Sequence, residues 1–118
     1  MKVCVLIALL FSSGCAYSQW TQEDTYRHAA LTALTVVDYS QTMKIAREPE
    51  RYHEHNPLLG SHPSAARVTA HFIGAYALAT AAAFALPAPY RKYFQYVAIG
   101  VETGCVANNF TIGLGFGL

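Results

Sequence analysis

Three ionisable side chains stand inside the apolar stretches of this sequence: Asp38, His71 and Glu102. Two carboxylates beside an imidazole can relay a proton or hold a ligand. The same groups can instead hydrogen-bond helices to one another, at about 0.6 kcal/mol per contact inside a membrane. The residue types allow both roles, and we favour the packing role because no motif specifies a reaction.

Further hydrogen-bonding side chains lie in the same stretches. An ionised carboxylate near the centre of a bilayer costs at least about 2.5 kcal/mol, so it should face the protein interior and find partners there. We therefore predict one interior polar cluster, made of Asp38, Gln41, Thr42, His71, Glu102 and Asn109.

Residues 48–63 form a polar loop with three histidines. His53, His55 and His62 could supply three imidazoles to zinc. A His-x-His step in a loop is a weak signal, however, and we predict no metal site. The sequence also lacks GxGxxG, Walker, CxxC and HExxH motifs, so it indicates no cofactor and no catalytic residue. A non-enzymatic role is favoured over an enzymatic one.

Three helical segments must position these residues. Thr21 and Asp24 resemble a capping box before the first segment, and Ser64 can cap the second. Prolines end the first two segments, and a glycine-rich tail that we expect to fray follows the third. Short connections make consecutive helices antiparallel neighbours. The predicted fold is an all-α, antiparallel three-helix membrane bundle, with helices at about 21–47, 64–86 and 90–111.

Two of these segments carry small residues at helical spacing. Gly100 and Gly104 form a GxxxG step, a packing motif of membrane helices, and Ala75 and Ala79 share one face of the second segment. We expect both faces to pack helices together. We also expect Cys105 to be a small buried side chain.

Composition favours a membrane protein. Hydrophobic residues make up 53% of the sequence and charged residues 13%, about half the charged share of an ordinary soluble domain. This balance excludes a disordered chain. The formal net charge of +1 lacks the excess of basic residues that nucleic-acid binding requires. A length of 118 residues allows one domain.

Segment 64–86 is long enough to span a bilayer, because its 19 residues from Val68 onward rise roughly 28 Å as a helix. The third segment begins with an aromatic and basic collar of the kind that anchors a helix end among lipid headgroups. The collar consists of Tyr90, Arg91, Lys92, Tyr93 and Tyr96.

The N-terminus has the pattern of a signal sequence, with Lys2 before an apolar run that is too short to span a bilayer. The residues up to Cys15 resemble a lipobox, which makes Cys15 a lipidation candidate. Residues 16–18 offer an ordinary cleavage site, and both alternatives stay open. We divide the chain into a signal sequence at 1–18 and a single helical membrane domain at 19–118.

Two motifs carry a resemblance to other proteins. Asp38 to Thr42 reads D-x-x-Q-T, and Glu54 to Ser64 reads E-x-N-P-x-L-G-x-x-P-S before an apolar helix. This pattern resembles a group of small, uncharacterised membrane proteins of bacteria and tailed phages, over about residues 20–112. The resemblance implies an envelope location and a matching helical arrangement, and it carries no activity.

Three functional hypotheses follow. The first is a small exported integral membrane protein of the bacterial or phage-host envelope, acting by interaction or as a structural subunit. Its partners would be membrane lipid and another protein or a second copy, and no nucleic acid. The second is a membrane-embedded enzyme or proton-coupled transporter that uses Asp38, His71 and Glu102. The third is an outer-membrane lipoprotein acylated on Cys15. We expect the inner membrane as the location, or the outer membrane if Cys15 is lipidated.

Overall fold

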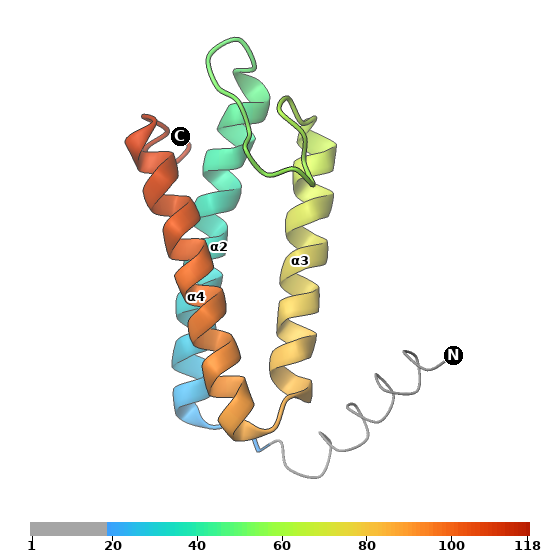
Figure 1. The fold of residues 1–118 in the computed structure, drawn as a ribbon, viewed down its shortest axis with the longest axis vertical. Helices are drawn as coiled ribbons and strands as arrows, with labels where there is room; N and C mark the ends of the chain where they lie inside the picture. Colours follow the sequence, from blue (N-terminus) through green and yellow to red (C-terminus); the bar gives the residue numbers. More distant parts are fainter. Residues whose placement is uncertain (1–18) are drawn as a thin grey trace, which may run out of the picture.

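The computed structural model describes residues 19–118, which form three helices. Figure 1 labels them α2 (Gln22–Arg47), α3 (Ala65–Ala85) and α4 (Ala88–Thr111). These bounds match the predicted segments to within two residues. No strand occurs between residues 19 and 118, so the all-α fold class is confirmed. The predicted signal sequence and the lipidation candidate Cys15 lie outside the described residues.

Local hydrogen bonds explain where the helices begin. The Thr21 hydroxyl accepts a hydrogen bond from the Asp24 amide at 3.2 Å, and the Asp24 carboxylate accepts one from the Thr21 amide at 2.9 Å, so the predicted capping box is present. At α3 the Ser64 hydroxyl accepts a hydrogen bond from the Arg67 amide at 3.2 Å. A proline lies in the first turn of α4, where a backbone amide would have no helical partner.

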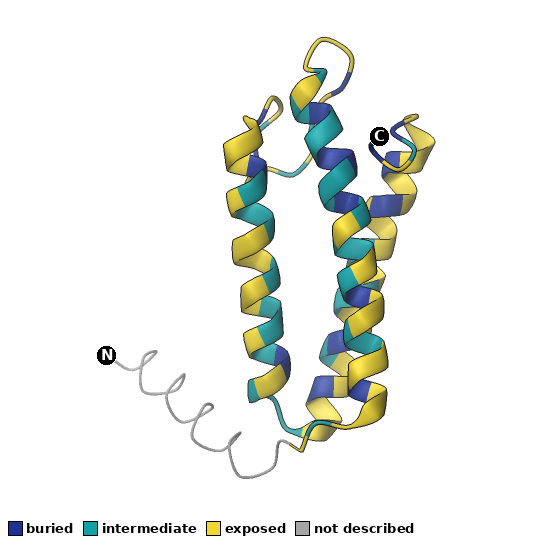
Figure 2. Ribbon diagram, turned by 180° about the vertical axis from the view of Figure 1, so that it is seen from behind, coloured by how far each residue is buried: buried dark blue, intermediate teal, exposed yellow. Residues whose placement is uncertain are grey.

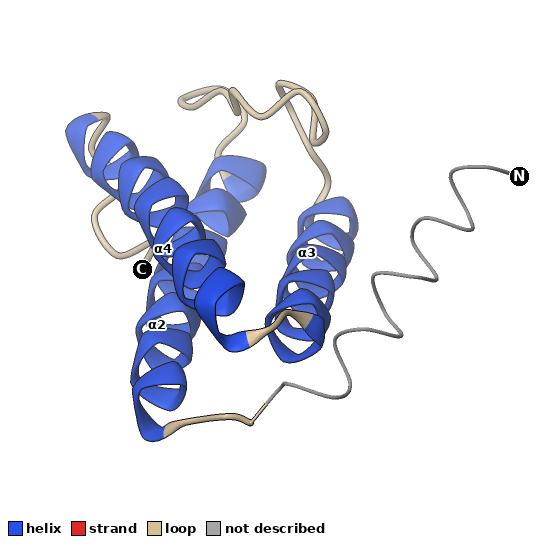
Figure 3. Ribbon diagram, turned by 60° about the horizontal axis from the view of Figure 1, so that its bottom comes forward, coloured by secondary structure: helices blue, strands red, loops and turns tan. Residues whose placement is uncertain are grey.

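The three helices alternate in direction. Figure 1 shows α2 and α4 rising from the same end of the molecule, while α3 runs the opposite way. Figure 3 shows α4 in front of α2, with α3 to one side of this pair. The most extensive helix contact joins α2 to α4. The first turns of α2 and α4 therefore lie beside each other, at the end where α3 finishes.

Polar side chains take an unusually large share of the buried positions, and large apolar side chains are exposed on α3. The largest completely buried side chains include Arg91, Gln41 and Gln95, whereas Ile73 and Leu78 on α3 are 65% and 73% exposed. Figure 2 shows few buried residues along α3. A water-soluble domain of this size normally buries its large apolar side chains and leaves its charged ones outside. Several large apolar side chains of α3 are therefore left in contact with the surroundings of the bundle.

The C-terminal tail is anchored on α2, which corrects the expectation that it frays. Leu114 forms a buried apolar cluster with Ile45 and Tyr52. The side-chain amide of Gln41 donates a hydrogen bond of 2.6 Å to the Gly115 carbonyl. The glycines prevent a regular helix as expected, but they also let the chain turn back onto its neighbour.

Gly117 makes the closest approach of the tail to α2. Its φ of +79° is in the left-handed region, and a Cβ at this position would lie 2.2 Å from the backbone carbonyl carbon of Ser40. Only glycine satisfies both conditions without a shift of the backbone. The glycine content that suggested disorder is thus what permits close docking.

Candidate functional site

A hydrogen-bonded cluster joins α2 to α4 in the half of the bundle nearer the 48–63 loop. The Asn109 side-chain amide donates to Asp38 Oδ1 at 2.8 Å and to Gln41 Oε1 at 3.1 Å. Thr42 also hydrogen-bonds Asp38, and all four residues are buried. On α2, Gln41 and Thr42 follow Asp38 by three and four residues, which puts all three side chains on one helical face. The structure thus brings together four of the six predicted cluster residues.

Glu102 adds a second carboxyl group to this cluster. It lies two helical turns before Asn109, on the same face of α4. Its carboxyl hydrogen-bonds that of Asp38. Two carboxyls in such contact repel each other when both are ionised, which favours a single proton shared between them. The Oε2 atom of Glu102 is buried and has no hydrogen-bond partner within residues 19–118.

His71 does not contact the carboxyl pair, contrary to the expectation that it is their direct partner. Its Nε2 lies 3.4 Å from the side-chain nitrogen of Asn56, in the loop. No hydrogen bond among the described residues joins His71 to Asp38 or Glu102. A cavity separates α3 from the other two helices at this level, and His71 faces the carboxyl pair across it.

This central cavity has a volume of about 620 Å³ and is lined by all three helices and by the loop. The volume is within the range of small-molecule sites. Its lining has an apolar part and a polar part. The apolar part includes Leu31, Phe72, Ala75, Ala79, Ala98 and Val101. The polar part includes the acids Asp38, Glu54 and Glu102, the histidines His53, His55 and His71, and the asparagines Asn56, Asn108 and Asn109.

The loop histidines do not form a metal site in this structure. The rings of His53 and His62 pack edge to face, with centroids 4.8 Å apart. His55 is exposed and lines the cavity together with His53. Within residues 19–118, no group of three or more His, Cys, Asp or Glu side chains is arranged to hold a metal ion.

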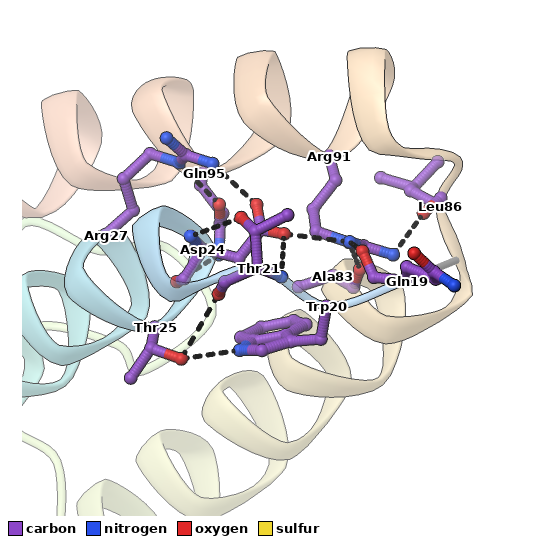
Figure 4. Close-up of polar contacts among 10 residues, drawn as sticks. All are labelled: Gln19, Trp20, Thr21, Asp24, Thr25, Arg27, Ala83, Leu86, Arg91 and Gln95. Atoms are coloured by element: carbon purple, nitrogen blue, oxygen red, sulfur yellow. Dashed lines mark hydrogen bonds and ion pairs between the residues drawn. The ribbon is translucent and has the colours of Figure 1, made fainter. Parts of the chain in front are cut away.

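A second polar cluster lies at the opposite end of the bundle, and sequence reasoning missed it (Figure 4). Arg91 is completely buried and donates to Asp24 Oδ2 at 2.9 Å. Arg27 contacts the other oxygen of Asp24, and its Nε donates to Gln95 at 2.8 Å. The Arg91 guanidinium also lies over the Trp20 ring, 5.2 Å from its centroid. We call Asp24, Arg27, Arg91 and Gln95 the Arg91 cluster.

Arg91 also completes the C-terminus of α3. Its Nε donates to the Ala83 carbonyl at 2.7 Å and its Nη2 to the Leu86 carbonyl at 3.0 Å. The last carbonyls of a helix have no partner within it, and a cation at that end is also favoured by the helix dipole. One side chain therefore ties the end of α3 to the starts of α2 and α4. The prediction that Arg91 belongs to a lipid-facing collar is wrong.

The charge of Asp24 is held by its partners. Burial alone would raise the pKa of Asp24, but hydrogen bonds from the Thr21 amide and from the Arg91 and Arg27 guanidiniums outweigh burial and lower the pKa to about 2. The Arg91 cluster is thus a compensated buried ion network, and its geometry offers no open acceptor or donor for a substrate. It serves to connect the helices.

A third polar group joins α2 to α3. His28 Nε2 lies 3.3 Å from the Tyr76 hydroxyl and 3.2 Å from the Thr80 hydroxyl. The hydroxyls of Thr32 and Tyr76 are 2.6 Å apart. These residues are outside the predicted cluster, although His28 and Thr32 lie one turn apart on α2. Together they supply polar contacts along the face that α3 turns towards α2.

The predicted packing residues do not bring helices of this chain together. Gly100 and Gly104 are exposed, and a Cβ built at either position meets no atom within 4 Å. Ala75 and Ala79 line the central cavity. Cys105 is exposed, not buried as expected, and it lines the central cavity. The GxxxG face remains available to another molecule.

Comparison with known proteins gives no further assignment. The chain matches no protein-family model, and no curated protein or solved structure shows significant similarity to it.

Proposed function

We propose that this chain is a small integral membrane protein of the cell envelope that acts by interaction with other proteins or as a structural subunit. The observation that carries the proposal is the combination of buried polar groups with exposed apolar ones. The interior holds the Arg91 cluster and Asp38, while large apolar side chains are exposed on α3 and α4, among them Ile73, Leu78 and Val101. Hydrocarbon, unlike water, stabilises such a surface, and it drives polar groups inward.

Helix α3 gives the clearest support. It has 21 residues, which corresponds to roughly 31 Å at the helical rise and to the thickness of a bilayer core. An 18-residue window within it has a mean hydropathy of 1.5, and only 11% of that window is buried. It is the one helix within residues 19–118 that is apolar enough to span by composition. The core helix of a soluble protein would be mostly buried, and α3 is not.

Aromatic side chains at one end fit the level of the lipid headgroups. Tyr26, Tyr90, Tyr93 and Tyr96 are between 52% and 68% exposed, near the end where α2 and α4 begin. Tyrosine is enriched at both membrane interfaces because its ring is apolar and its hydroxyl is polar. In this placement the Arg91 cluster lies at the same interfacial level, at the edge of the hydrocarbon.

The interaction role rests on what the outer surface offers. The exposed Gly100 and Gly104 give α4 a face that the backbone of another helix can approach closely. The described contacts within the chain leave this face unoccupied. We therefore place the function in the membrane plane, in contact with another envelope protein or a second copy.

Two matched leucines test the membrane placement. Leu78 in the middle of α3 and Leu58 in the loop are 73% and 70% exposed. Each is replaced by cysteine in a cysteine-free background, and opened membranes are treated with a charged maleimide and with an apolar one. We expect the charged reagent to label Leu58→Cys and not Leu78→Cys. Equal labelling of both variants by the charged reagent would overturn the proposal.

Extraction provides an independent test in which acylation cannot hold the chain. The Cys15→Ser variant should remain in the pellet after alkaline carbonate treatment, because α3 itself anchors it. Release of this variant as a monodisperse chain without detergent would show that the helices fold in water. In that case the third hypothesis, a lipoprotein held only by acylation at Cys15, would be preferred.

A second candidate function has a specific observation in its favour. Asp38, His71 and Glu102 line the same cavity, although His71 is not bonded to either acid. This arrangement favours a proton-coupled transporter or membrane-embedded enzyme. If this role holds, we expect the His71→Phe variant to insert normally but to lose the cellular phenotype that depends on the wild-type chain. A fall in protein level without another effect would instead indicate a packing role.

A further inference from the structure

We propose that the central cavity is a binding site for a primary ammonium group carried on a short apolar body. This inference deepens the second candidate function and rests on it. The cavity supplies three properties that such a molecule requires: negative charge, open hydrogen-bond acceptors and apolar walls. Each follows from a different part of its lining.

The charge of the lining selects cations. Three carboxyls face the cavity, from Asp38 on α2, Glu102 on α4 and Glu54 in the loop, and no lysine or arginine accompanies them. The Asp38–Glu102 pair retains one negative charge even when it holds a proton. An anionic site beside low-dielectric walls attracts a compensating cation. Anionic ligands such as phosphates are disfavoured for the same reason.

The acceptors select a cation that carries N–H groups. Glu102 Oε2 is buried and lacks a donor, so it costs free energy until one arrives. Asp38 accepts from Asn109 with one oxygen, which leaves further acceptor capacity on its carboxylate. A primary ammonium presents three donors on one small head. A quaternary ammonium presents none and would leave Oε2 unsatisfied.

The walls select the rest of the molecule. Part of the cavity lining is formed by small or apolar side chains, among them Ala75 and Ala79 on α3 and Leu31 on α2. The short alanine side chains leave volume for a ligand, and none of these side chains offers it a hydrogen-bonding group. A hydrocarbon chain directed away from the carboxyl pair would be removed from water along this wall. A bare metal ion would leave this volume unused, and the described residues form no metal-holding group.

Binding should displace the shared proton to bulk solvent. The ammonium then replaces the proton as the positive charge between Asp38 and Glu102, so charge is conserved at the site. The groups around the pair that could take up the proton instead are His71 on α3, Glu54, His53 and His55 in the loop, and Cys105 on α4. Release to solvent, measured directly, separates displacement from such internal transfer.

Titration calorimetry of the full chain in detergent tests the proposal. Hexylammonium is the probe, and hexanol and hexyltrimethylammonium have the same chain without charge or without N–H donors. From the size of the probe we expect a dissociation constant of about 10 µM to 1 mM for hexylammonium, at least tenfold weaker binding of both analogues, and about one proton released per amine. Equal affinity for hexanol or hexyltrimethylammonium would overturn the proposal, as would tight zinc binding that excludes the amine.

Variants locate the site. Glu102→Gln should weaken hexylammonium binding at least tenfold and abolish proton release, while Glu50→Gln, an equal charge change in the exposed part of the loop, should change neither. If Glu102→Gln fails to fold, Ala79→Leu fills the apolar wall without a charge change and should weaken binding as well. Wild-type affinity in both Glu102→Gln and Ala79→Leu would refute the assignment of the cavity.

The same ammonium chemistry occurs on free amines and on aminophospholipid headgroups. A second titration in micelles containing phosphatidylethanolamine distinguishes the sources. Competition with hexylammonium would identify a lipid headgroup as an occupant, and unchanged binding would identify a free amine. A negative result in these titrations leaves the maleimide labelling unaffected, so failure of the cavity assignment is distinguishable from failure of the membrane placement.

Discussion

Replacement of Arg91 by methionine tests whether this residue connects the helices or merely anchors α4 among lipid headgroups. Methionine keeps most of the apolar stem and removes the guanidinium. The matched control is Lys92→Met, which removes the same charge from the next position, where the side chain is exposed. An interfacial anchor would make the two substitutions similar, whereas the structure makes them very different.

The magnitude follows from the four hydrogen bonds of the Arg91 guanidinium, whose acceptors are the carbonyls of Gln19, Ala83 and Leu86 and the carboxylate of Asp24. Removing one partner of a buried ion pair costs about 3–5 kcal/mol. Each buried carbonyl left without a donor adds about 1–3 kcal/mol. Because a second arginine still contacts Asp24, the ion-pair loss is at the lower end of its range. Of the three carbonyls, only that of Ala83 accepts a fully buried bond, so about 1–3 kcal/mol adds to about 3 kcal/mol for the ion pair. We expect about 4–6 kcal/mol in total for Arg91→Met and less than about 0.5 kcal/mol for Lys92→Met.

Unfolding of the detergent-solubilised chain by increasing SDS, followed by circular dichroism, measures these changes. A double-mutant cycle with Asp24→Asn isolates the direct pair and should give a coupling of about 0.5–3 kcal/mol. If Arg91→Met is no more destabilising than Lys92→Met, Arg91 does not hold the ends of the three helices together. The polar interior would then contribute little to the stability of the fold.

Three further predictions concern other parts of the bundle. Gly117→Ala should release the C-terminal tail from α2, seen as faster amide exchange, while Gly113→Ala, which has positive φ but no close neighbour, should cost only about 1–2 kcal/mol and keep the tail docked. Asn109→Ala removes the donor shared by two buried acceptors and should destabilise by about 1–3 kcal/mol, whereas the exposed Asn108→Ala should have little effect. The pKa of Asp24 is lowered from 3.8 to about 2 in the folded chain. Its contribution to the free energy of unfolding is therefore complete above about pH 4 and disappears as the pH falls through 2. Over this interval the stability of the wild-type chain should drop more than that of Asp24→Asn.

The helices were predictable from the sequence because their signals are local. The capping box at Thr21, the Ser64 cap and the prolines around the breaks act within a few residues of each helix end. The shared face of Asp38, Gln41 and Thr42 follows from helical periodicity alone. These features need no knowledge of how the helices pack.

The partners of buried groups were less predictable, because they depend on geometry between helices. Arg91 stands among tyrosines and a lysine in the sequence, and this context is also typical of an interfacial collar. Its burial follows only when α2 and α4 begin at the same end and α3 delivers its last carbonyls there. For His71 the contact was predicted and is absent. Counting residues from the helix ends put His71 at about the depth of the two acids, but such a count does not reveal the cavity between the helices.

The two polar ends of the bundle differ in a way that bears on function. In the Arg91 cluster the negative charge of Asp24 is balanced by two arginines, and the geometry leaves no place for a ligand. In the Asp38 cluster no lysine or arginine of residues 19–118 accompanies the carboxyl pair, one oxygen of Glu102 has no donor among these residues, and the cavity adjoins the pair. A purely structural interior would gain stability by balancing both ends alike, since an uncompensated buried acceptor is costly. This imbalance is the feature that the proposed ammonium site would resolve, because a bound cation would supply the charge and the donors that the carboxyl pair lacks.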